Sequence, residues 1–131
     1  MQIIASAHHR AHDTRYSLPG YDSRYDEVPE RAEAILDALR AGGLGAMQEP
    51  NDHGLAPILA AHDAGLIGFL QGAYQGSRDA LAGDAPLFPS GYFAVRGWQR
   101  RPVSWQHRAG YYAIDRDCPI LAGTWSAAYW S

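Results

Sequence analysis

Apolar residues along the chain fall into short runs and helical stripes, which together predict an α/β domain. Residues 2–7 form a β-branched, apolar run that predicts a buried strand. Pro29 suits the first position of a helix, and residues 32–39 place apolar side chains on one helical face until Gly42-Gly43 ends the pattern. Residues 44–48 then predict a second short strand, so the order is strand, helix, strand.

Two further helices are predicted in the middle of the chain. A short one covers residues 54–61, and a longer one covers residues 64–81, where apolar side chains recur at steps of three and four. Asp63 is placed to cap the longer helix. The glycines in that helix each cost about 1 kcal/mol of helix propensity relative to alanine, so the helix depends on tertiary packing. These glycines, which would allow another backbone to approach closely, are Gly65, Gly68, Gly72 and Gly76.

Three stretches have no clear period. Residues 8–28 predict a long polar loop, and loops of that length in compact domains are usually functional or mobile. Residues 83–106 predict another loop with an extended run at 92–96, and residues 109–114 fit either a strand or a loop. Near the end, Thr124 predicts the N-cap of a helix with an aromatic stripe.

That last helix is short for the apolar face it carries. It begins at Thr124 and ends at Ser131, whereas an isolated helix needs about 12–15 residues to be even marginally stable in water. The whole chain has 131 residues, which is enough for one domain and too few for two. We therefore expect residues 1–131 to be a single partial domain.

Composition and charge exclude several classes of protein. The net charge is −3 with scattered arginines, so a concentrated basic face for nucleic acid is not expected. No apolar run approaches the roughly 18 residues of a membrane helix, and the apolar start is too short for a signal peptide. A lone cysteine, Cys118, suits a reducing compartment. These features predict a soluble, cytoplasmic protein with neither nucleic acid nor a membrane as partner.

The strongest local cluster of chemical groups is His8-His9-x-x-His12-Asp13. Two histidines four apart on a helix can share a zinc ion, and Asp13 could complete or orient the set. The segment follows a strand and has the composition of a loop, however, and the metalloprotease motif requires a glutamate where His9 stands. A solvated polar loop is therefore the alternative.

Other candidate groups are weaker. His62 and Asp63 could act as a base with its orienting carboxylate, but a helix cap explains Asp63 more simply. The run Asp115-Arg116-Asp117 could bind a cation or form a solvated turn, and nothing around Cys118 indicates an activated thiolate. The sequence has no G-x-S-x-G, G-x-G-x-x-G or Walker motif. The residues alone therefore name no reaction.

Several motifs occur in order along nearly the whole chain. They are Ser6 and His9 after the first strand, Pro29-Glu30-Arg31-Ala32-Glu33, His53-Gly54-Leu55 and His62-Asp63-Ala64-Gly65-Leu66 with Phe69-Leu70. In this order they resemble the N-terminal region of the zinc-dependent deacetylase superfamily, which includes histone deacetylases and acetylpolyamine amidohydrolases; Leu66 replaces the usual tyrosine. The motifs that look closer to the acetylpolyamine branch are Phe93-x-Val95-Arg96, Gly110-Tyr111-Tyr112 and Gly123-Thr124-Trp125.

The resemblance implies an α/β fold of the arginase-deacetylase type, with short parallel strands, helices and long loops. It implies hydrolysis of acetylated polyamines or acetyl-lysine-like amides with zinc as the cofactor. The family's zinc ligands and paired histidines lie beyond the matched region, so no catalytic or metal-binding residue is assigned and no zinc is expected on this chain alone. Residues 8–28 look like the family's loop at the mouth of the site and the dimer contact. Asp117 looks like an acidic residue that faces the substrate's distal ammonium.

Three hypotheses of function remain open from the sequence. The first is the N-terminal portion of a deacetylase that lacks the catalytic half. The second is a non-catalytic short paralogue or split subunit that acts as a binding or dimerisation module; in either case a homo-oligomer is expected. The third is an independent metal site at His8, His9, His12 and Asp13.

Overall fold

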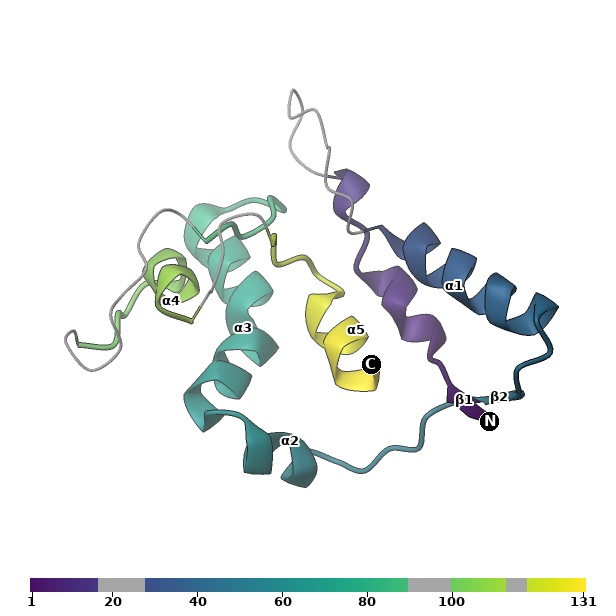
Figure 1. Cartoon of the computed structure of the whole chain (residues 1–131). Coiled ribbons are helices and arrows are strands. Elements are labelled where there is room, and N and C mark those ends of the chain that lie inside the picture. Colours follow the sequence, from purple (N-terminus) through teal and green to yellow (C-terminus); the bar gives the residue numbers. More distant parts are fainter. Residues whose placement is uncertain (17–27, 90–99, 113–117) are drawn as a thin grey trace.

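The computed structural model describes residues 1–16, 28–89, 100–112 and 118–131. Figure 1 shows the helices α4, α3, α5, η1 and α1 side by side in this order. The two strands lie next to the start of η1, and α2 lies at the start of α3. The elements are β1 Gln2–Ile4, the 3₁₀ helices η1 Ala7–Ala11 and η2 Thr14–Tyr16, α1 Pro29–Ala41, β2 Ala46–Gln48, α2 Ala56–Ala61, α3 Ala64–Leu81, α4 Trp105–Tyr112 and α5 Thr124–Trp130.

The two strands form a parallel pair linked by α1, which confirms the predicted strand–helix–strand unit. Ile3 of β1 lies opposite Met47 of β2, and the backbone N–H of Ala5 extends the ladder by donating to the carbonyl of Gln48 at 3.0 Å. Ile3 is buried but Ile4 is 62% exposed, so only one face of β1 is covered. The predicted buried strand is therefore shorter and more exposed than its apolar composition suggested.

Helix α1 has the predicted bounds but hardly any core. It begins with Pro29 at its first position and ends before Gly42, whose N–H donates to the carbonyl of Ala38 at 2.9 Å. None of its residues is buried, and Ile35 on its apolar face is 61% exposed. Polar contacts with η1 and η2 join this helix to the rest of the described chain, and Leu36 on its apolar face is half-buried.

The hydrophobic core lies between α3 and α4. Phe69 stacks against Tyr112 with ring centroids 5.3 Å apart and also contacts Trp105 at 6.1 Å. The glycines of α3 make this approach possible, because a Cβ atom at Gly76 would overlap the indole of Trp105. The side chain of Asp63 accepts a hydrogen bond from the N–H of Leu66 at 3.0 Å, so the predicted cap of α3 is confirmed. The other buried members of this core are Ala73, Leu87, Ala109 and Ile120.

Helix α5 lies between α3 and η1. Its start packs against η1 so closely that a Cβ atom at Gly123 would overlap the backbone carbonyl of Ala11. Gly123, not Thr124, occupies the N-cap position, so the predicted cap is wrong by one residue. The Thr124 hydroxyl instead accepts a hydrogen bond from the N–H of Leu121 at 2.8 Å and thereby fixes the turn before the helix.

Two loop predictions need correction. The described part of the stretch 8–28 contains the end of η1 and all of η2, so most of it is 3₁₀-helical. Hydrogen bonds from His9, His12 and Arg15 to neighbouring helices stabilise it in this form. Residues 109–112 are neither strand nor loop but the end of α4, which also takes in the last two residues of the predicted loop 83–106. The predicted extended run at 92–96 lies outside the described residues. No helix within the described ranges is long and apolar enough to cross a membrane.

Candidate functional site

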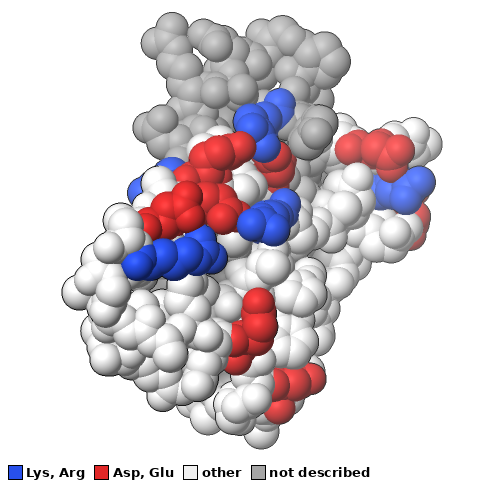
Figure 2. Space-filling view, turned by 90° about the vertical axis from the view of Figure 1, so that its right-hand side faces the viewer, with Lys and Arg blue, Asp and Glu red and all other residues white. Residues whose placement is uncertain are grey.

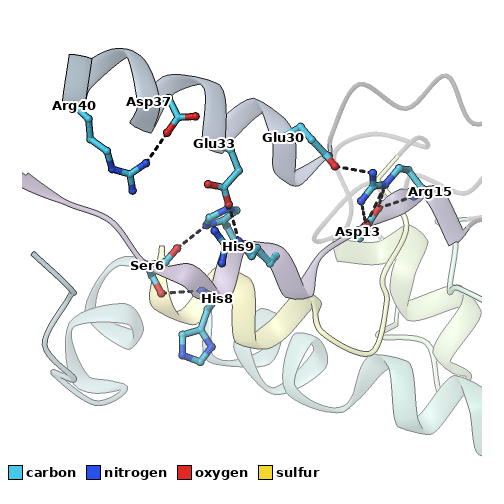
Figure 3. Close-up of polar contacts among 10 residues, drawn as sticks. Ser6, His8, His9, Asp13, Arg15, Glu30, Glu33, Asp37 and Arg40 are labelled. Carbon is cyan, nitrogen blue, oxygen red and sulfur yellow. Dashed lines mark hydrogen bonds and ion pairs between the residues drawn. The ribbon is translucent and has the colours of Figure 1, made fainter. Parts of the chain in front are cut away.

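Polar contacts surround η1, and His9 lies at their centre (Figure 3). Its Nδ1 atom lies 2.6 Å from the carbonyl oxygen of Ser6, and its Nε2 atom lies 2.9 Å from Oε1 of Glu33 on α1. A carbonyl and a carboxylate can only accept hydrogen bonds. Through these two contacts the His9 ring joins η1 to α1.

Glu33 accepts a second hydrogen bond from the same helix. Nε of Arg10 donates to Oε1 of Glu33 at 2.6 Å. The hydrogen bond from Arg10 and then the one from His9 hold the pKa of the Glu33 carboxyl below its usual value. Two side chains of η1 thus hold one carboxylate near the start of α1.

A second group of ion pairs joins η2 to the first turn of α1. Arg15 donates to the carboxylate of Asp13 and, through Nη1, to Oε1 of Glu30 at 2.6 Å. The hydrogen bond from Arg15 is the main cause that lowers the pKa of Asp13. Figure 2 shows acidic and basic side chains interleaved on the face that carries α1. Because exposed ion pairs contribute little each, this network orients α1 without fixing it firmly.

The other two histidines of the motif face α5. Nδ1 of His8 lies 3.0 Å from Oγ of Ser126, and the His8 ring stacks on Trp130 at a centroid distance of 5.2 Å. Nδ1 of His12 lies 2.9 Å from Oγ1 of Thr124. The spacing of four residues therefore places both rings against one neighbouring helix.

These contacts engage the residues of the hypothetical metal site in separate interactions. His8, His9 and His12 hydrogen-bond to three different partners, and Asp13 is taken up by Arg15. Within the described ranges, no group of three or more His, Cys, Asp or Glu side chains is close enough to hold a metal ion. The cluster is a structural junction between α1, η1 and α5.

A large cavity separates α1 from α3 and α5. Its volume is about 790 Å³, and its walls are mostly apolar, with Ile35 on one side and Phe69 and Ala127 on the other. His9, His12 and Thr124 border it, and each already makes the hydrogen bonds given above. Arg31 also lines it, whereas none of its described lining residues is Asp or Glu. Such a cavity suits apolar groups and disfavours a cation.

A smaller cavity of about 280 Å³ lies where β1 and β2 end. Ser6, Arg10, Glu33 and Gln48 line it. Ligands of open α/β sheets often bind at the carboxyl ends of the strands. Two arginines and two glutamates line this cavity, and Arg10 donates to Glu33, so it has no excess of one sign.

The remaining candidates have different outcomes. Asp63 caps α3, which favours the simpler interpretation of the His62-Asp63 pair. Cys118 lies half-buried at the large cavity. Asp115, Arg116 and Asp117 lie outside the described residues, so the role of Asp117 in substrate binding stays a prediction.

Sequence reasoning missed a contact between α5 and the segment before α2. The hydroxyl of Tyr129 donates to Asp52, whose Oδ1 also accepts from the N–H of Gly54 at 2.8 Å. These bonds lower the pKa of Asp52, and the bond to Asp52 raises the pKa of Tyr129. The Asp-x-Gly pattern indicates the turn, but nothing in the sequence indicates its partner on α5.

We expect Glu33→Gln to loosen α1 and to weaken the response of stability to acid. The folded-state pKa of Glu33 is depressed, so the unfolded chain takes up this proton first as pH falls. The contribution of Glu33 to the free energy of unfolding is present above the ordinary glutamate pKa of about 4.3. It is lost as pH falls through the lower pKa that Glu33 has in the folded state. Thermal unfolding of the unchanged chain and of E33Q between pH 7 and pH 3 measures the difference in their stability. This difference should become smaller as the pH falls.

Asp37→Asn is the matched control. Asp37 pairs with Arg40 inside α1 at 2.7 Å, so its loss leaves the junction with η1 intact. If E33Q and D37N gave the same pH dependence, Glu33 would not hold α1 in the way described.

Comparison with known proteins relates the chain to one group of hydrolases, although no protein-family model matches it. It is 39% identical over 130 residues to acetylpolyamine amidohydrolase 2 of Pseudomonas aeruginosa and 34% identical to acetylpolyamine amidohydrolase of Mycoplana ramosa. These alignments cover 97% and 98% of this chain, but the chain spans only 37% and 38% of the two relatives.

A solved structure gives the same result for the fold. The crystal structure of acetylpolyamine aminohydrolase from Burkholderia pseudomallei matches with a TM-score of 0.81 and 28% identity, over 99% of this chain and 37% of that one. The predicted resemblance to the acetylpolyamine branch and the predicted arginase-deacetylase fold are thereby confirmed. The shares covered are consistent with the N-terminal portion that the motifs indicated.

Proposed function

We propose that this chain, which is related to the acetylpolyamine amidohydrolases over nearly its whole length, is the N-terminal portion of a deacetylase that hydrolyses acetylated polyamines. The observation that carries the proposal is the similarity over 97% of the chain to only 37% of a full-length amidohydrolase. Residues 1–131 would then form one partial domain of a cytoplasmic, homo-oligomeric enzyme.

The described part of the chain would supply scaffold, because it does not fit a zinc site. The junction at η1 uses its histidines and carboxylates to join helices, which leaves no set of ligands among the described residues. On this proposal, any zinc and the water that attacks the amide belong to the portion of the enzyme that the chain does not span. The Asp117 carboxylate would bind the distal ammonium of the substrate, since opposite charges attract strongly at a desolvated site.

A hybrid enzyme tests the proposal. This chain replaces the 130 residues of the Pseudomonas aeruginosa amidohydrolase 2 that it matches, and release of free amine from a mono-acetylated diamine is measured. We expect the hybrid to release amine and its Asp117→Asn variant to show a raised KM for this substrate and no change for an uncharged acetamide. A folded, zinc-loaded hybrid without hydrolysis would overturn the proposal.

A second candidate is a non-catalytic binding or dimerisation module. The large apolar-lined cavity beside α1 favours it, because extended apolar surface open to solvent often marks contacts between proteins. Light scattering distinguishes the two: a module of this kind gives a stable oligomer of the isolated chain. A compact monomer would remove this candidate.

A further inference from the structure

The two walls of the large cavity differ in how they are held. The wall formed by α3 and α5 belongs to the packed part of the molecule, since Phe69 and Ala127 are buried. The opposite wall, α1, contributes Ile35 with 61% of its surface exposed and has no buried residue. Ion pairs join α1 to η1 and η2, and Leu36 and Leu39 on its apolar face are only half-buried, so α1 is covered less completely than the opposite wall.

A cavity of this size and polarity is unusual inside a finished domain. Protein interiors are packed as densely as organic crystals, with few voids larger than a water molecule. Here about 790 Å³ lies between apolar walls. The sheet is also unfinished in the described residues, because two strands do not make a stable sheet without further strands or covering helices.

The chemistry of the walls selects the occupant. A polyamine is a cation, and the described lining offers Arg31 but no carboxylate side chain, so the substrate does not belong here. Apolar protein side chains fit these walls. The relatives supply a source of them, because the chain spans 37% of the Pseudomonas aeruginosa enzyme.

We infer that this cavity is the docking surface for the remainder of the amidohydrolase fold, whose apolar side chains pack between α1 and the α3–α5 wall. The inference rests on the proposed function and adds where the two portions meet. Docking turns α1 from a partly covered helix into a packed element. It buries Ile35, and it leaves exposed those apolar side chains that lie away from the cavity.

Two residues of nearly equal exposure test this. Ile35 is 61% exposed and lines the cavity, whereas Leu81, at the end of α3, is 62% exposed and does not line it. Each is replaced by cysteine in a Cys118→Ser background, both in this chain and in the hybrid enzyme described above. The rate of alkylation at each site is measured by peptide mass spectrometry.

We expect both cysteines to react at similar rates in the isolated chain. In the hybrid, the I35C site should react at least roughly tenfold more slowly, while the L81C site should stay within about twofold of its rate in the chain. An I35C site that reacts as fast in the hybrid as in the isolated chain overturns the inference, whether the hybrid folds otherwise or not. A protected I35C site in a hybrid that releases no amine keeps the docking surface and overturns the proposed function instead.

Discussion

Gly76→Ala should destabilise the chain by about 1–3 kcal/mol, the usual cost of forcing extra atoms into a packed interface. The added methyl group would occupy the position of the Trp105 indole. That indole cannot simply move away, because Phe69 lies on one side and the guanidinium of Arg108 lies over the ring at 5.0 Å. Urea unfolding followed by circular dichroism measures the loss in the free energy of unfolding.

Gly68→Ala provides a control in the same helix with the opposite expected sign. A Cβ atom at Gly68 would have no heavy-atom neighbour within 4 Å. Alanine has the higher helix propensity and restricts the unfolded chain, so G68A should stabilise by about 0.4–1 kcal/mol. Equal effects of G76A and G68A would mean that α4 does not pack on α3 as described.

Phe69→Ala should cost about 3–5 kcal/mol, the range for removing a buried aromatic side chain. Phe69 is 4% exposed and stacks on Tyr112, and it contacts Trp105 as well, so its loss leaves a void at the centre of the core. Because domains are stable by only about 5–15 kcal/mol, a large part of the chain should then be unfolded at physiological temperature. Calorimetry measures the fall in the unfolding temperature.

Leu81→Ala is the control for this prediction, because Leu81 is an exposed residue of the same helix. It should change the free energy of unfolding by less than about 0.5 kcal/mol. A loss for F69A no larger than that for L81A would place the core elsewhere.

The sequence predicts those elements whose ends are marked by local chemistry. Helix α1 begins at Pro29 and ends just before Gly42, and α3 begins after the cap Asp63, so the sequence predicts both with the bounds that the structure gives. Helix α4 was missed, although Ser104 accepts from the N–H of His107 at 3.3 Å and apolar residues follow at helical spacing. Its tyrosines favour extended structure and Gly110 disfavours helix locally, and packing on α3 overrides both preferences.

The candidate site was less predictable for a physical reason. The histidines of residues 8–12 have the right types and spacing for zinc, but their partners Ser126, Thr124 and Glu33 come from segments far along the chain. The large cavity likewise has walls from α1, α3 and α5, and no local pattern reports that these walls face each other. The family motifs predict the fold correctly because they are matched by residue type and by their order along the chain. That match needs no knowledge of which segments are in contact.

Hydrogen exchange of the isolated chain tests most directly whether α1 is packed less completely than α3. Helix α3 buries Ile67, Phe69, Ala73 and Ser77, whereas α1 buries none of its residues. Amides of α1 should therefore exchange by local opening, at least roughly a hundredfold faster than the core amides of α3. That difference is the result we predict. Amides in α1 that are protected as strongly as those in α3 would contradict it, because α1 would then be a finished part of the domain.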